Sequence, residues 1–150
     1  MPVFKRYNKT AKISVTEVMT KPPISIKAGS SLQAAAELMW DRKVGSIIVL
    51  DDFEGRVVGM FTERDIVYCA AKHLFNTQRE TLLDSVMSRN VVSVSPEEST
   101  TAVIEKMRAH NLRHMPVVDL NGVPIGMVSL RDILDVSLTL LGLFTPPDVA

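Results

Sequence analysis

The chain has 150 residues, of which 46% are hydrophobic and 23% charged, a composition typical of a globular protein with a substantial core. Its 17 basic residues balance 17 acidic ones, but residues 1–12 carry four basic residues and no acid. A basic segment on an otherwise acidic chain is a poor match to a nucleic-acid-binding surface, and no apolar run reaches the ~18 residues of a membrane span.

The sequence contains an internal repeat. The stretch GMFTERDI at 59–66 recurs as GMVSLRDI at 126–133, with five of eight positions identical, and the VMT at 18–20 recurs as VMS at 86–88. The spacing between matching residues of the two copies changes by one residue in the turns, where an insertion or deletion costs little free energy. The chain is therefore interpreted as two copies of one domain, at 14–74 and 81–136, joined by a linker at 75–80. A basic tail at 1–13 and an apolar extension at 137–150 flank them.

The first copy predicts, in chain order, a helical turn capped by Ser14, an extended stretch at 24–26, a helix opened by Ser30, strands at 46–50 and 56–61, and a second helix from Thr62. Pro22 and Pro23 keep the extended stretch out of a helix. The first long helix places apolar residues at i, i+3, i+4 and i+7 from Leu32.

The second copy predicts a turn capped by Thr81 with Asp84, an extended stretch at 91–94, a helix whose start is marked by Pro96 and Ser99, strands at 115–118 and 123–128, and a helix from Ser129. Asn121-Gly122 is a strong hairpin signal. Each copy thus has the order β-α-β-β-α, which predicts mixed sheets in an α/β (α+β) fold.

The strand-to-helix junctions admit two interpretations. Thr62 with Asp65, and Ser129 with Asp132, have the spacing of a helix cap with an acid at the third position, which accounts for all four residues. A helix N-terminus also suits a phosphate, and the carboxylate can accept from a ribose diol. The two interpretations are compatible.

These features together resemble a tandem pair of cystathionine-β-synthase (CBS) domains. The resemblance covers 14–136 and rests on VMT and VMS, the helices AAELM and AVIEKM, the stretch LRHMPVVD at 112–119, and the two Gly-x-x-[Thr/Ser]-x-x-Asp junctions. It implies two pseudo-symmetric copies packed sheet to sheet, with adenosine-containing ligands bound in clefts between them.

The resemblance also implies roles for individual residues. It assigns ribose binding to Asp65 and Asp132, phosphate-side hydroxyls to Thr62 and Ser129, and phosphate contacts to Arg113 and His114, where the first copy has Gly45 and Ser46. The adenine is expected to lie against two extended stretches, Pro23 with Ile24 and Asn90 with Val91. The remaining residues of the predicted ligand-binding set are Thr20, Arg64, Arg131, Met115 and Pro116.

Other groups of residues give weaker indications of function. His110 and His114 have the i, i+4 spacing of a zinc pair, but Pro116 and the following valines indicate that the helix ends before His114, so no metal ion is predicted. No nucleophile–base motif appears, so no catalytic residue is predicted. Cys69, the single cysteine, allows no internal disulfide and is expected in the core. The apolar stretch at 136–144 either folds back on its own domain or forms a subunit contact.

We therefore expect a stand-alone, cytoplasmic regulatory module, not an enzyme, that binds an adenosine nucleotide (AMP, and also ADP or ATP) without a cofactor. About a dozen residues outside the repeats at each end are too few for a catalytic domain. The expected partners are the nucleotide, a second copy of the chain and a regulated protein, with neither nucleic acid nor membrane. The alternatives are a purely structural interaction module with empty clefts, a module that binds S-adenosylmethionine, or a small hydrolase or nucleotidyl enzyme.

Overall fold

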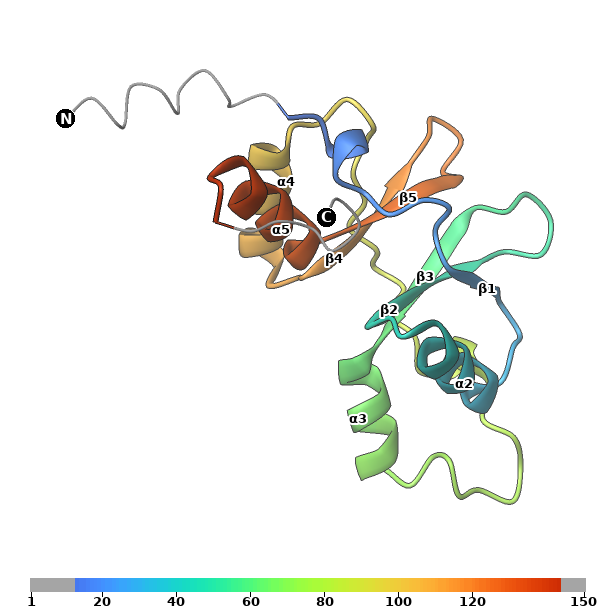
Figure 1. Cartoon of the computed structure of the whole chain (residues 1–150). Helices are drawn as coiled ribbons and strands as arrows, with labels where there is room; N and C mark the ends of the chain where they lie inside the picture. The colour runs from blue at the N-terminus through green and yellow to red at the C-terminus, as the bar shows by residue number, and fades with distance from the viewer. Residues whose placement is uncertain (1–12, 144–150) are drawn as a thin grey trace. The chain divides into compact units, whose positions relative to one another are not determined.

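The structure, a computed structural model, describes residues 13–143 and has the expected mixed α+β fold (Figure 1). Its elements in order are η1 (Val15–Glu17), β1 (Ser25–Lys27), α2 (Leu32–Arg42), β2 (Ser46–Leu50), β3 (Val57–Thr62), α3 (Glu63–Ala71), η2 (Leu83–Ser85), α4 (Thr100–His110), β4 (His114–Val118), β5 (Pro124–Ser129) and α5 (Leu130–Leu140). The two η elements are single 3-10 turns.

The chain forms two compact units. Unit 2 consists of residues 23–91 and 120–124. Its sheet has the order β1-β2-β3, with β1 parallel and β3 antiparallel to β2, and Ser46 pairs with Thr62. The core of unit 2 joins side chains of α2, β2, β3, α3 and the segment around η2: Leu32, Ala35, Met39, Ile47, Val49, Phe61, Cys69, Leu83 and Met87. Cys69 is therefore a core residue, as predicted.

Unit 1 comprises, within the described residues, 13–22, 92–119 and 125–143. Strands β4 and β5 pair in a two-stranded sheet, and α4 and α5 contact each other. The core of this unit is formed by Val15, Val18, Val94, Val103, Met107, Met115, Val117, Val128 and Ile133.

The compact units differ from the sequence repeats because each repeat gives its leading segment to the other unit. Val15 opens the first repeat, yet its N–H donates to the carbonyl of Glu98 at 3.0 Å in unit 1. Its counterpart Leu83 opens the second repeat and donates to the carbonyl of Ser30 at 2.8 Å in unit 2. Both side chains are fully buried in the core that receives them.

The repeated glycines lie where the exchanged segments approach the strands. A Cβ on Gly126 would lie against the side chain of Met19 and 3.1 Å from the carbonyl oxygen of Thr20. A Cβ on Gly59 would meet Met87 in the same way and lie 3.1 Å from the carbonyl oxygen of Ser88. Glycine at both positions therefore permits backbone approach that a larger residue would oppose.

Two predicted helix caps are wrong. Ser31, not Ser30, caps α2, and its hydroxyl accepts from the N–H of Ala34 at 3.0 Å. Leu82 occupies the cap position of η2, because the Thr81 hydroxyl donates to the carbonyl of Leu74 and the Asp84 carboxylate accepts from Gly29 N–H. Both polar side chains thus bind elsewhere in unit 2. The caps predicted at Ser14 and Ser99 are confirmed.

The extended stretch predicted at 91–94 is reduced to one bridge, Val94 with Val117. This bridge is parallel and matches the pairing of β1 with β2 in the first copy. In that copy the N–H of Ala28 donates to the carbonyl of Leu50 beyond the end of β1. Pro96 occupies the corresponding position and has no N–H. At the other end of the pairing, the N–H of Ile48 donates to the carbonyl of Ile24, and the residue equivalent to Ile48 is Pro116, which also has no N–H. The two prolines explain the shorter pairing.

The glycine contact predicts a stability change. Gly126→Ala should lower the free energy of unfolding by about 1–3 kcal/mol, because the added methyl displaces Met19. In a Met19→Ala background the cost should be smaller, since the longer side chain is gone. Urea denaturation of the four proteins of this cycle measures the difference, and an equal cost in both backgrounds would contradict the contact.

Candidate functional site

In unit 2 the candidate site lies at the β3–α3 junction. Thr62 ends β3 and stands at the cap position of α3. The Oδ2 atom of Asp65 accepts from the N–H of Thr62 at 2.9 Å and from its hydroxyl at 3.2 Å. The carboxylate thus holds the residue that joins strand to helix, at the N-terminal end of α3.

In unit 1 the β5–α5 junction contains a complete capping box. The N–H of Asp132 donates to the Ser129 hydroxyl, and the N–H of Ser129 donates to Oδ2 of Asp132, both at 3.0 Å. The predicted cap is therefore confirmed. The caps occupy one carboxylate oxygen of Asp65 and one of Asp132, and within the described residues the other oxygen of each forms no hydrogen bond. The cap leaves that oxygen available to a ligand.

Backbone hydrogen bonds bring the residue before β4 or β2 to these junctions. The N–H of Leu130, first in α5, donates to the carbonyl of Arg113 at 2.8 Å. The N–H of Glu63, first in α3, donates to the carbonyl of Gly45 at 3.0 Å. The equivalent backbone positions therefore carry an exposed guanidinium in unit 1 and no side chain in unit 2.

The exchanged segments flank the same junctions. Thr20 and Met127 exchange two backbone hydrogen bonds, of 2.8 and 3.0 Å, which place Thr20 beside the end of β5. Met60 and Ser88 form the equivalent pair, both bonds 2.9 Å long, and Ser88 lies two residues before Asn90. These extended segments thus border the sites without belonging to the named strands.

The predicted ligand-binding residues fall into two groups. Unit 1 contains Thr20, Arg113, His114, Met115, Pro116, Ser129, Arg131 and Asp132, and unit 2 contains Pro23, Ile24, Thr62, Arg64, Asp65, Asn90 and Val91. Arg64, Asn90 and Arg131 are exposed. Met115 is fully buried, so its side chain belongs to the core of unit 1.

His110 and His114, which have the spacing of a zinc pair, do not lie on the same helix, and this confirms the prediction. Helix α4 ends at His110, and His114 is the first residue of β4. In the part of the chain that the structure describes, no group of three or more His, Cys, Asp or Glu residues is arranged to hold a metal ion.

The charge of Asp65 also acts on its own helix. Burial raises the pKa of the Cys69 thiol, and the nearby Asp65 carboxylate raises this pKa further. The thiol is therefore neutral near pH 7 and has the character of a small apolar core residue.

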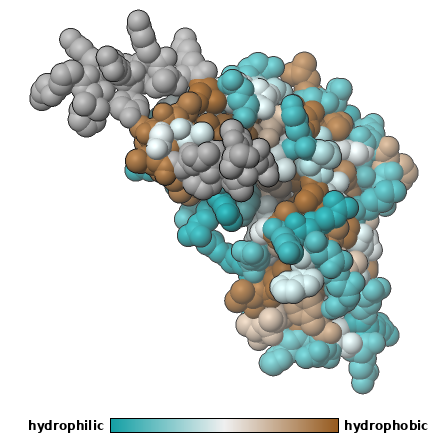
Figure 2. All heavy atoms as spheres, viewed as in Figure 1, coloured by the Kyte–Doolittle hydropathy of each residue, from teal (hydrophilic) through white to brown (hydrophobic). Residues whose placement is uncertain are grey.

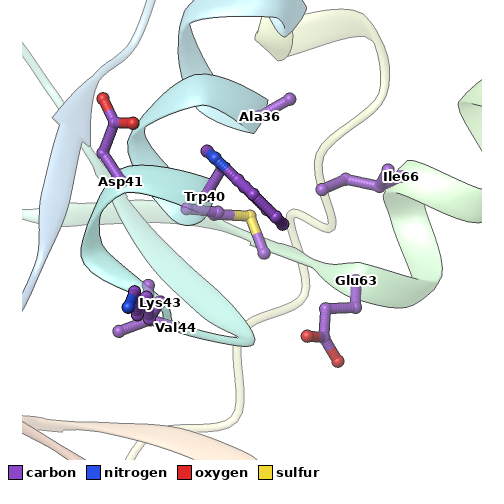
Figure 3. A pocket seen from close by; sticks show the side chains of 8 residues that line it. Ala36, Trp40, Asp41, Lys43, Val44, Glu63 and Ile66 are labelled. Carbon is purple, nitrogen blue, oxygen red and sulfur yellow. The ribbon is translucent and has the colours of Figure 1, made fainter.

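A groove between α2 and α3 has a volume of about 750 Å³ (Figure 3). In Figure 3, Ile66 points from α3 toward Trp40 on α2, with Glu63 nearby. Trp40 is 82% exposed. Sequence reasoning missed this feature, although Trp40 lies outside the i, i+3, i+4, i+7 stripe that faces the core.

The apolar extension is only partly packed. Val136 packs against the core of unit 1, whereas Leu140, Leu141 and Leu143 are exposed, and Phe144 lies outside the described residues. Hydrophobic patches interrupt the polar surface on the face drawn in Figure 2. No helix within residues 13–143 is both long enough and apolar enough to span a membrane.

Comparison with known proteins decides the family. The sequence model of the CBS domain family matches residues 15–72 and 83–139. The chain belongs to the CBS domain family. The CBS domain-containing protein YhcV of Bacillus subtilis is 32% identical over 120 residues, which cover 80% of this chain and 82% of YhcV.

Solved CBS domain structures share the fold. The CBS domain protein PAE2072 from Pyrobaculum aerophilum, complexed with AMP, is 27% identical, with a TM-score of 0.76 over 87% of this chain and 98% of that one. The CBS domain pair of protein MJ0100, in complex with 5′-methylthioadenosine and S-adenosyl-L-methionine, is 27% identical, with a TM-score of 0.75 over 87% and 97%. Some curated relatives are much longer: the chain spans 24% of the L-aspartate semialdehyde sulfurtransferase of Methanocaldococcus jannaschii.

The capping box predicts a local stability effect. Ser129→Ala should lower the free energy of unfolding by about 1 kcal/mol, because the N–H of Asp132 loses its acceptor. Ser137→Ala in the same helix is the matched control. The Ser137 hydroxyl donates to the carbonyl of Ile133 within the helix, so its loss should cost little. Equal urea midpoints for Ser129→Ala and the parent protein would contradict the cap.

Proposed function

We propose that this CBS domain pair is a regulatory module that binds an adenosine nucleotide, with AMP the preferred ligand and ADP and ATP its competitors. The observation that carries the proposal is the duplicated strand–helix junction, where Asp65 and Asp132 each keep one oxygen outside the cap. The AMP complex of the Pyrobaculum relative supports the choice of ligand.

The chemistry of each junction suits such a ligand. The available oxygen of Asp65 or Asp132 can accept hydrogen bonds from both hydroxyls of a ribose, and such charge-assisted bonds are stronger than neutral ones. The positive end of the helix dipole favours a phosphate nearby. In unit 1 the exposed Arg113 adds a cation that can bind phosphate oxygens in pairs.

S-adenosylmethionine is the second candidate. It shares the adenosine that the carboxylates would bind, and the MJ0100 pair was crystallised with this ligand. It carries a cationic sulfonium and no phosphate, so Arg113 and the helix N-terminus would contribute less to its binding. A purely structural module with empty sites is the remaining alternative, and it would bind neither compound.

We propose further that the module acts without catalysis, as a homodimer that passes nucleotide binding to a regulated protein. Exposed apolar side chains in both units support a subunit contact. They include Trp40 and Val67 in unit 2, and Leu134 and Leu140 in unit 1.

Ligand binding is tested by thermal shift and calorimetry with AMP, ADP, ATP, S-adenosylmethionine and NAD. AMP at 100 times its Kd should add about 2.7 kcal/mol, a rise in Tm of roughly 5–10 °C, with no turnover. Asp132→Ala should remove the tight binding event, whereas Asp52→Ala, a change of an exposed loop acid, should leave it intact. Failure of every adenine compound to bind would refute the proposal.

The two sites are expected to differ in affinity. An Arg–phosphate bond contributes about 1.5–3 kcal/mol, so Arg113 should make the Asp132 site one to two decades tighter in Kd than the Asp65 site. Arg113→Ala should weaken the binding of AMP far more than the binding of adenosine, because adenosine lacks the phosphate. Arg79→Ala, at an exposed linker position, is the control. If Asp65→Ala, rather than Asp132→Ala, removed the tight event in calorimetry, the assignment would be reversed.

A further inference from the structure

Two turns of unit 2 hold large apolar side chains in solvent. Phe53, in the turn between β2 and β3, is 96% exposed, and Leu120, in the turn between β4 and β5, is fully exposed. Among residues 13–143, no other large apolar side chain is as exposed as these two. Each follows an aspartate just after its strand, so both copies of the repeat have an apolar turn.

A backbone hydrogen bond joins the two turns. The N–H of Val57, the first residue of β3, donates to the carbonyl of Gly122 at 3.0 Å. A Cβ on Gly122 would lie 3.9 Å from side-chain carbons of Arg56. Residues 120–124 belong to unit 2 together with the whole β2–β3 hairpin. Phe53 and Leu120 therefore lie on neighbouring turns of one compact unit.

The turn that carries Phe53 is held by its own hydrogen bonds. Oδ1 of Asp51 accepts from the N–H groups of Phe53, Glu54 and Gly55 at 3.2, 2.7 and 2.9 Å. These bonds, the one from Glu54 foremost, lower the pKa of the Asp51 carboxyl, which is therefore charged near pH 7. Gly55 supplies the positive φ, 67°, that closes the turn. A side chain on a fixed turn loses little freedom on binding, which suits an anchor residue.

Acidic side chains surround this apolar anchor. Residues 51–56, DDFEGR, contain three acids and one base. Among the described residues Asp52 is exposed and forms no ion pair, whereas Glu54 pairs with Arg56 at 2.6 Å. We call Asp52, Phe53, Glu54 and Leu120 the turn face. The turn face is apolar and acidic, so it complements a binding segment that is apolar and basic.

The chain itself contains a segment with this chemistry. Residues 1–12, MPVFKRYNKTAK, lie outside the described residues, and their sequence has four basic residues, no acid, and the apolar Val3, Phe4 and Tyr7. The segment leads into Ile13, whose carbonyl accepts from the N–H of Thr100 at 3.0 Å. Twelve extended residues span up to about 40 Å, so the segment is long enough to reach a surface remote from Ile13.

We propose that residues 1–12 bind the turn face. The apolar side chains of the segment pack on Phe53 and Leu120, and its basic residues pair with Asp52. The contact removes both exposed apolar side chains from water. It also withholds the turn face from other proteins until the segment is displaced. This inference goes beyond the proposed function and requires neither the nucleotide nor a dimer.

Tryptic cleavage of the full chain tests the contact. Trypsin cuts after the four basic residues of the segment, and a bound segment is cut only in the fraction of time that it is released. Phe53→Ser and Asp52→Asn should each raise the cleavage rate of the segment by about fivefold, as measured by mass spectrometry of the intact chain. A Phe53→Ser protein whose segment is cut at the parent rate would overturn the proposal.

Matched variants and a second cleavage site control this test. Val67→Ser and Asp41→Asn change exposed residues of unit 2 outside the turn face, so the segment should be cut at the parent rate in both. Arg79, an exposed linker position, is the internal reference. Equal cleavage after Arg79 in all variants shows that unit 2 stays folded. Faster cleavage of the segment in the two control variants would also overturn the proposal.

Binding of the isolated segment is the second test. In a full chain with Lys5→Glu, Arg6→Glu and Lys9→Glu the turn face should be free, because the attached segment has lost its complementary charge. The synthetic peptide MPVFKRYNKTAK, added to this variant, should shift the amide NMR signals of Phe53 and Leu120. Signals that do not move would contradict the contact.

A second peptide separates the apolar contribution from charge alone. It carries serine in place of Val3, Phe4 and Tyr7 and keeps all four basic residues. It should bind the same variant about tenfold more weakly than the natural peptide, because it has no apolar side chains to pack on Phe53 and Leu120. Equal affinity of the two peptides would show attraction by charge alone and would overturn the proposed contact.

Discussion

Each compact unit depends on the leading segment of the other sequence repeat. The N–H of Val15 donates to Glu98 and that of Leu83 donates to Ser30, and each of these donor residues is fully buried in the core it joins. A single repeat would therefore lack part of its core and expose unpaired backbone groups. Gly59 and Gly126 serve the same constraint, because the exchanged segments run too close to the strands for a side chain.

This constraint also shapes the candidate sites. The exchanged segment pairs with the strand that leads into the capped helix, so Thr20 and Ser129 belong to one unit although more than a hundred residues separate them. The carboxylate at each junction then serves two purposes. One oxygen stabilises the helix start, and the other is available to bind a ligand. Stability and proposed function thus depend on the same four junction side chains.

The two copies share a backbone but differ in side chains at positions that face outward. Gly45 corresponds to Arg113, and Trp40 to Arg108. Such changes cost little stability, because exposed positions tolerate substitution. They give the two candidate sites different side chains at equivalent backbone positions. Buried positions such as Phe61 and its counterpart Val128, by contrast, are apolar in both copies.

The sequence alone determined the repeat, the order of elements, the junction caps and the family resemblance. These follow from local patterns: apolar periodicity, turn residues, and hydroxyl–acid spacing at Thr62 and Ser129. Where the local signals were ambiguous, the tertiary structure decided which hydrogen bonds and strand pairings form. Thr81 matched a cap, but its hydroxyl donates to the carbonyl of Leu74. The 91–94 stretch keeps only the bridge from Val94 to Val117, because Pro96 and Pro116 lack N–H donors. The exchange of leading segments and the Trp40 groove depend on contacts distant in sequence, which no local pattern encodes.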